Sequence, residues 1–197
     1  MRSFLKLLVS FVFLGVFFAF SHGVQAKTPP HGAVASAHPL ATQAGIDLLK
    51  QGGNAFDASI AIASTLAVVE PHGSGLGGGG FWLIYQAKSK KYIFIDAREA
   101  SPIKLTEKML LDEKGTPKKE DILNGVLGAG IPGEIAAFDY IAKHFAIQTP
   151  KEQLKYAIQA AKEGFPVTES LKKMISFRLN ALQKSKESSQ LFLVNQA

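Results

Sequence analysis

Asp96, Arg98 and Glu99 are the residues whose types and spacing are best suited to bind a charged ligand. They follow an apolar stretch that we expect to form a hairpin of two strands, residues 81–87 and 91–95. A guanidinium presents a planar fork of donors that can hold a carboxylate through two parallel hydrogen bonds, which a lysine cannot do. The two acids could fix the orientation of Arg98. The alternative is that Arg98 only pairs with one of them at the surface.

Four consecutive glycines, residues 77–80, come directly before the first of these strands. Such a run is poor in both helix and strand, because each glycine costs backbone entropy and brings no side chain to pack. It indicates that another segment or a ligand approaches the backbone closely. A phosphate-binding loop would need Lys-Ser or Lys-Thr and then a helix, whereas Phe81-Trp82 and a strand follow. We interpret the run as a tight passage beside the wall of a binding site.

The composition excludes several classes of chemistry. The sequence has no cysteine, which excludes disulfides, thiolate zinc sites and a thiol nucleophile. His38 and His72 have no partners at metal-ligand spacing, so we expect no metal site, and no organic cofactor is implied. His144 lies near the end of an expected helix, where the helix dipole favours a positive charge. The formal net charge of +6 is too mild and scattered to indicate a nucleic-acid partner.

Residues 1–26 have the order of a secretory signal. Arg2 and Lys6 precede an apolar run, residues 7–20, and Val24-Gln25-Ala26 resembles a cleavage site. The run is short for a membrane span. We therefore expect cleavage after Ala26, a mature chain of residues 27–197, a periplasmic or secreted location and no membrane contact after cleavage. An uncleaved anchor is the alternative.

Helices must position the candidate site. Pro39 suits a first helical turn, and Gly52-Gly53 suits a helix end before Asn54, which can cap a second helix over residues 55–69. That second helix is apolar nearly all round, so we expect it to be buried. We also predict short strands over 31–37 and within 124–133, and helices that begin near residues 134, 150 and 168, the last of them continuing to Leu182.

Several short motifs occur in one order along the chain. They are Gly52-Gly53-Asn54 with Asp57-Ala58, Val69-Glu70-Pro71, the stretch 74–81, Asp96-Ala97-Arg98-Glu99 and Gly130-Ile131-Pro132-Gly133. Together, from about residue 32 to at least 167, they resemble the start of the large subunit of the gamma-glutamyltranspeptidases, also called glutathione hydrolases. The resemblance implies an α+β fold, the N-terminal-nucleophile hydrolase αββα sandwich, with only its N-terminal portion present. It also implies that Arg98 is substrate-binding and holds the α-carboxylate of the gamma-glutamyl group.

The same resemblance implies gamma-glutamyl transfer and hydrolysis of glutathione and other gamma-glutamyl compounds. In this family the nucleophile is a threonine at the N-terminus of the small subunit, and its own amine can act as base. No threonine of this sequence stands in a Thr-Thr-His-like motif, so we expect no catalytic residue in this chain and no activity of the chain alone. The expected partners are gamma-glutamyl small molecules, the remainder of the large subunit and the small subunit. The alternative is an inactive truncated remnant that binds a glutamyl ligand or does not fold alone.

Overall fold

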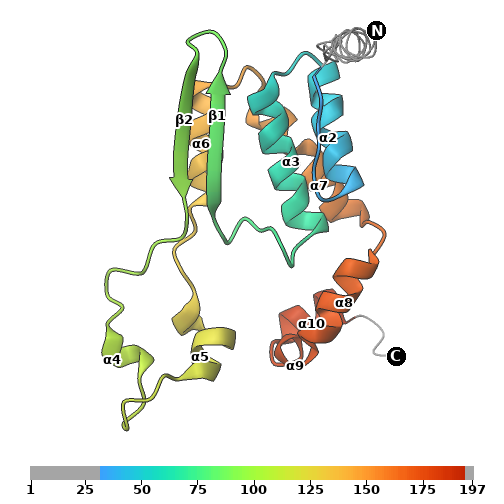
Figure 1. Cartoon of the computed structure of the whole chain (residues 1–197). Coiled ribbons are helices and arrows are strands. Elements are labelled where there is room, and N and C mark those ends of the chain that lie inside the picture. Colours follow the sequence, from blue (N-terminus) through green and yellow to red (C-terminus); the bar gives the residue numbers. More distant parts are fainter. Residues whose placement is uncertain (1–31, 194–197) are drawn as a thin grey trace, which may run out of the picture. The chain divides into compact units, whose positions relative to one another are not determined.

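The computed structural model describes residues 32–193 (Figure 1). The expected signal peptide, residues 1–26, lies outside this range. Within the range, no helix combines the length and the apolar character needed to cross a bilayer. The elements are α2 (Pro39–Lys50), α3 (Ala55–Val69), β1 (Gly80–Gln86), β2 (Lys91–Ala97), α4 (Glu107–Leu110), α5 (Lys119–Asn124), the 3-10 helix η1 (Val126–Gly128), α6 (Glu134–His144), α7 (Pro150–Glu163), α8 (Glu169–Phe177), α9 (Leu179–Leu182) and α10 (Lys186–Phe192).

The boundary between α2 and α3 confirms the prediction made from its turn residues. Gly52 takes a φ of +88°, which glycine adopts without the steric cost that a side chain brings. Asn54 then caps α3, because its side chain accepts hydrogen bonds from the backbone N–H groups of Phe56 (2.8 Å) and Asp57 (3.0 Å). Asp57 returns a bond by accepting from the Asn54 N–H at 2.8 Å, which completes a capping box.

Asp57 is fully buried and also joins α3 to the segment before α7. Its carboxylate accepts from the backbone N–H groups of Ile147 (3.2 Å) and Gln148 (2.9 Å) and from the side-chain amide of Gln153 (2.9 Å). Among residues 32–193 it has no ion-pair partner within 4.0 Å. The charge is therefore stabilised by N–H dipoles alone, which offset the cost of removing a carboxylate from water.

The hairpin is antiparallel, with Gly80 opposite Ala97 and Gln86 opposite Lys91. One face of the hairpin packs on α6, which lies behind it in Figure 1, and also contacts α3. The buried centre of this cluster consists of Ile60, Ile84, Phe138 and Ile141. Trp82 meets Phe138 edge to face, with ring centroids 5.9 Å apart. This packing fixes the end of β2, from which the candidate site begins.

The other face of the hairpin is apolar and exposed. Phe81 stacks on Phe94 at 5.5 Å between centroids, and Tyr85 lies 4.9 Å from Tyr92. The residues of this exposed face are between 51% and 73% exposed: Phe81, Leu83, Tyr85, Tyr92 and Phe94. A sheet with two apolar faces is typical of a sheet that is covered on both sides, so this face is suited to contact with further protein.

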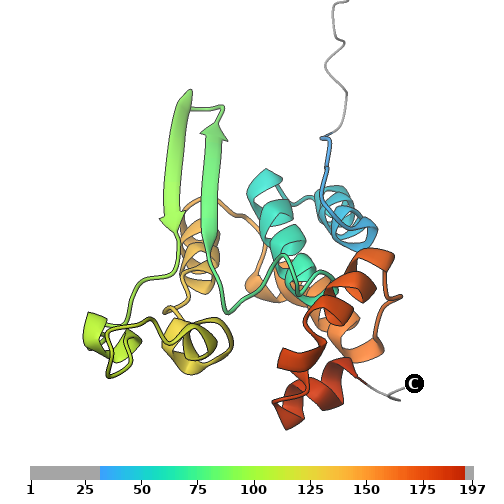
Figure 2. The ribbon, with the colours of Figure 1, turned by 60° about the horizontal axis from the view of Figure 1, so that its bottom comes forward.

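Three predictions of local structure are wrong. Residues 32–37 form no strand, because no described segment pairs with them to make a ladder. The expected buried strand within 124–133 is replaced by the end of α5, by η1 and by an isolated bridge between Ala100 and Ile131. The single helix expected from Thr168 to Leu182 is interrupted at Arg178, whose N–H bonds to the carbonyls of both Met174 and Ile175. Figure 2 shows the resulting group of short helices after α7.

Replacement of Asp57 by asparagine should destabilise the protein. An amide NH₂ cannot accept from the N–H groups that face it, so buried donors are left unpaired, at a cost of roughly 2–4 kcal/mol. Urea unfolding of the full chain measures this loss. Asp139→Asn is the matched control, because Asp139 is exposed and only pairs with Lys143 one turn away. Equal unfolding midpoints for the two variants would contradict the structural role of Asp57.

Candidate carboxylate-binding site

Arg98 directly follows β2 and is held by the two acids beside it in different ways. The Asp96 carboxylate accepts from the Arg98 backbone N–H at 3.0 Å and so fixes the main chain. The Glu99 carboxylate lies 3.0 Å from a terminal nitrogen of the guanidinium, close enough for an ion pair, although this oxygen has no partner in hydrogen-bond geometry. The Arg98 side chain is 54% exposed. Most of its donors therefore remain accessible to a ligand.

The backbone at Arg98 lies between two glycine segments. A Cβ added at Gly79 would come within 2.1 Å of the Ala97 carbonyl oxygen and 2.9 Å of the Arg98 Cα. A Cβ added at Gly133 would lie 2.3 Å from the same carbonyl oxygen and 2.9 Å from the Arg98 carbonyl oxygen. The Gly133 N–H also donates to the Gly78 carbonyl at 3.1 Å. The close approach expected at the glycine run is thus present, and it clamps the residue that carries the guanidinium.

A third contact extends this arrangement beyond Arg98. A Cβ at Gly130 would lie 2.6 Å from the Glu99 Cβ, and Ala100 and Ile131 exchange two backbone hydrogen bonds of 3.1 and 2.8 Å. Residues 130–133 therefore run beside residues 98–100. Between these segments and the start of η1 lies a depression of about 360 Å³, lined by Arg98, Glu99, Ser101, Leu105 and Leu127 among others.

Glu134 adds a second carboxyl group close to this site. It lines a separate depression of about 270 Å³ together with Trp82, Gly79 and Gly80. Burial raises the pKa of Glu134, and the negative charge of Glu99 raises it further, while a hydrogen bond from the Trp82 side chain opposes the shift. The neighbourhood holds one guanidinium and two carboxyl groups. A ligand carboxylate must therefore displace Glu99 or use the edge of the guanidinium that Glu99 leaves open.

The histidines singled out from the sequence do not gather at this site. His38 caps α2, since its Nδ1 accepts from the Leu40 N–H at 3.2 Å, and His72 contacts the Ser170 hydroxyl at 3.3 Å. His144 ends α6 as expected and contacts the Tyr140 carbonyl. In the part of the chain that the structure describes, no group of three or more His, Cys, Asp or Glu residues could hold a metal ion. Arg98 stays a candidate from the sequence, and the contacts of Gly130 and Gly133 with its segment were not predicted there.

Comparisons of sequence place these residues in a known context. The family model described as Gamma-glutamyltranspeptidase matches residues 41–197. The chain is 39% identical over 173 residues to "Glutathione hydrolase proenzyme" of Bacillus subtilis (strain 168), which covers 87% of this chain and 29% of that protein. It is 40% identical over 150 residues to the protein of the same name from Escherichia coli (strain K12), covering 76% and 25%. The chain thus spans less than a third of the length of these relatives.

Solved structures show the same likeness. Helicobacter pylori gamma-glutamyltranspeptidase superposes with a TM-score of 0.79 at 32% identity, covering 83% of this chain and 47% of that chain. Gamma-glutamyltranspeptidase from Pseudomonas nitroreducens, solved in complex with L-DON, gives a TM-score of 0.79 at 32% identity and covers 85% and 49%. These likenesses confirm the α+β fold class predicted from the sequence, that of the N-terminal part of an N-terminal-nucleophile hydrolase.

Replacement of Gly79 by alanine should displace the Arg98 segment. The added methyl group would overlap backbone atoms, which cannot rotate away as a side chain can, so we expect a destabilisation of roughly 1–3 kcal/mol. Gly77→Ala is the matched control, because a Cβ at Gly77 would meet no atom within 4 Å. Thermal unfolding measures both variants. If Gly77→Ala and Gly79→Ala lower the unfolding midpoint equally, the close approach at Gly79 is not important for stability.

The raised pKa of Glu134 gives a second prediction, on pH dependence. A carboxyl group whose pKa is higher in the folded state favours folding below its unfolded pKa and loses this contribution as pH rises through the folded value. Glu134→Gln should therefore raise the thermal midpoint relative to the unsubstituted chain at pH 7, and this gain should disappear near pH 4. Glu163→Gln, at the exposed last residue of α7, serves as the control. A gain from Glu134→Gln that is the same at both pH values would contradict the shift.

Proposed function

Because the chain belongs to the gamma-glutamyltranspeptidase family, we propose that it supplies the carboxylate-binding arginine of a site for gamma-glutamyl transfer. The substrate class is glutathione and other gamma-glutamyl compounds, which such a site transfers to an acceptor or to water. In this proposal Arg98 holds the α-carboxylate of the gamma-glutamyl group. The observation that supports it is the half-exposed guanidinium of Arg98 on a clamped backbone beside a depression of about 360 Å³.

The role of the chain's own residues is to bind and orient. Two parallel hydrogen bonds from the guanidinium to a carboxylate fix both the position and the plane of the ligand. Asp96 holds the Arg98 backbone, and Glu99 holds the side chain until a ligand carboxylate takes its place. Gly79 and Gly133 keep the segment from shifting between the two states. A rigid clamp of this kind lowers the entropy lost when the gamma-glutamyl carbonyl meets its nucleophile.

Acyl transfer also needs a nucleophile and groups that stabilise the oxyanion. We assign neither to residues of this chain. We place the nucleophile and the groups that stabilise the oxyanion in the remainder of the family polypeptide. The nucleophile is then a threonine at the N-terminus of the small subunit. Residues 1–197 alone are then inactive. The second candidate function is binding of a glutamyl ligand without catalysis, by a truncated remnant of the enzyme.

The exposed face of the hairpin supports contact with that remainder. Five large apolar side chains at 51–73% exposure form one continuous face on β1 and β2. Apolar patches of this kind mark protein contacts more often than they mark free surface. We propose that the remainder of the large subunit and the small subunit cover this face.

The location follows from the N-terminal sequence. We propose that residues 1–26 are a signal peptide and that residues 27–197 form the N-terminal part of the large subunit outside the cytoplasm. The mature enzyme would then be periplasmic or secreted and would meet gamma-glutamyl compounds there.

Substitution of Arg98 tests the proposed ligand contact. Hydrogen bonds to charged groups are worth about 1.5–3 kcal/mol, so Arg98→Ala should weaken the binding of L-glutamate about 10- to 100-fold. The affinity of Arg98→Lys for L-glutamate should lie between those of the unsubstituted chain and Arg98→Ala, because lysine keeps the charge and loses the planar fork. Isothermal titration of the full chain measures all three affinities. Lys162→Ala removes another exposed positive charge, outside the lining of this site, and should leave the affinity unchanged. An equal loss in both alanine variants would count against the assignment.

A further inference from the structure

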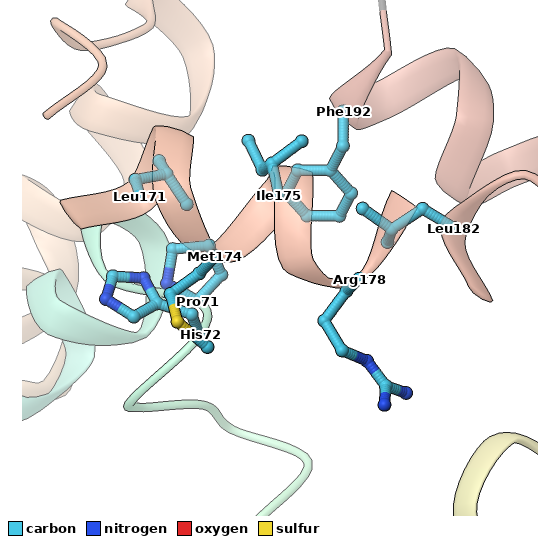
Figure 3. Close-up of a pocket in the computed structure, with 8 residues that line it drawn as sticks. All are labelled: Pro71, His72, Leu171, Met174, Ile175, Arg178, Leu182 and Phe192. Carbon is cyan, nitrogen blue, oxygen red and sulfur yellow. The ribbon is translucent and has the colours of Figure 1, made fainter. Parts of the chain in front are cut away.

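A third concave site lies between the loop that follows α3 and the three C-terminal helices. It has a volume of about 320 Å³, at the lower end of the range for small-molecule pockets. Figure 3 shows its lining, which comes from Pro71 and His72 on one side and from α8, α9 and α10 on the other. Leu171 is 4% exposed and belongs to the buried part of this lining. The site shares no lining residue with the two depressions near Arg98.

The body of this pocket is apolar. Its carbon-rich side chains are Pro71, Leu171, Met174, Ile175, Leu182 and Phe192. Methionine is unbranched and polarisable and adapts to ligands of different shape. An unbranched alkyl chain would exchange water for these contacts and gain about 0.8 kcal/mol for each methylene group that it buries.

The polar groups at the edge of the pocket are cationic or neutral. Arg178 donates to the Asn124 side-chain oxygen at 2.5 Å, and within residues 32–193 it has no carboxylate within 4.0 Å. In Figure 3 its guanidinium extends away from the apolar side chains. The nearby acid Glu120 is already engaged: its pKa is lowered chiefly by a hydrogen bond from Lys184, with a smaller contribution from the charge of Arg178.

The surrounding helices are also positively charged. Residues 168–193 contain five basic and two acidic side chains, 5 − 2 = +3. The basic residues are Lys172, Lys173, Arg178, Lys184 and Lys186, and the acidic ones are Glu169 and Glu187. Lys184 is paired with Glu120, however, and Glu70 lies 4.0 Å from His72 on the other side of the pocket. The positive charge that lines the pocket without a paired carboxylate among residues 32–193 is therefore that of Arg178, and it favours a ligand of the opposite charge.

From this combination we propose that the pocket binds a small amphipathic carboxylate, with its alkyl chain among the apolar side chains and its carboxylate on Arg178. The planar guanidinium matches a carboxylate better than any lysine of α8 does. A neutral alcohol of the same chain length gains the apolar contacts but not this ion pair. A short-chain acid gains the ion pair but not the contacts. The ligand class is therefore a medium-chain fatty acid.

The methionines allow the site to be observed directly. The sequence has three, Met1, Met109 and Met174, and of these Met174 lines the pocket while Met109 lies on α4. The full chain, labelled with ¹³C at the methionine methyl groups, is titrated by NMR with octanoate, 1-octanol and butyrate. We expect octanoate to shift the Met174 signal and to leave Met109 unchanged. Octanol should bind more weakly, and butyrate should give no shift.

Two variants separate the charge from the pocket itself. Arg178→Gln should lower the affinity for octanoate about tenfold, since one charged hydrogen-bonded pair is lost. The affinity for octanol should stay unchanged. Lys173→Gln, an exposed change on the same helix, should lower the affinity for octanoate far less than Arg178→Gln does and should leave the affinity for octanol unchanged. Retained octanol binding shows that the Arg178→Gln pocket is still formed. Absence of a Met174 shift with octanoate, as when another segment fills the pocket, overturns the proposal, and so does equal octanoate affinity with and without Arg178.

Discussion

A buried carboxylate that has no positive partner among residues 32–193 joins α3 to α7 and to the segment before it. Asp57 accepts the N–H groups of Asn54, Ile147, Gln148 and Gln153, and these donors come from three separate segments. A hydrophobic cluster alone tolerates small sliding of helices, since its contacts are not directional. A buried carboxylate that must keep several N–H donors at hydrogen-bond distance does not allow such sliding. Asp57 therefore adds a directional constraint on the position of α3 to the apolar contacts that Ile60 and Ala61 make.

The candidate site adds a constraint of a different kind, because it is built by backbone proximity rather than by side-chain packing. Gly79 and Gly133 come so close to the Ala97 and Arg98 main chain that no other residue fits without movement of the backbone. The aromatic and aliphatic contacts of α6 with one face of the hairpin set where β2 ends. The packing of the hairpin on α6 therefore determines where Arg98 lies, and the close approach of Gly79 and Gly133 fixes the direction of its backbone.

Features determined by neighbouring residues were predictable from the sequence. The caps at Asn54, Thr149 and Thr168, the helix over residues 55–69 and the hairpin depend on side chains a few positions apart. The structure of residues 124–133 was not predictable in this way, because Gly125 and Gly128 lie against the backbone of α5 and take no part in strand pairing. Arg98 was predicted as a candidate through its motif, whereas the role of Gly133 beside it depends on a contact between segments far apart in the sequence. No periodicity reveals such a contact.

That separation in sequence has a consequence for the order in which the protein folds. The segment around Arg98 is complete only when three stretches, near residues 79, 98 and 133, have come together. Contacts between distant residues must first overcome the entropy of closing the loops between them, so they form later than a hairpin or a helix does. During synthesis the hairpin can pair while residues 130–133 are still being added. Arg98 therefore acquires its direction only after the strands that present it are already in place.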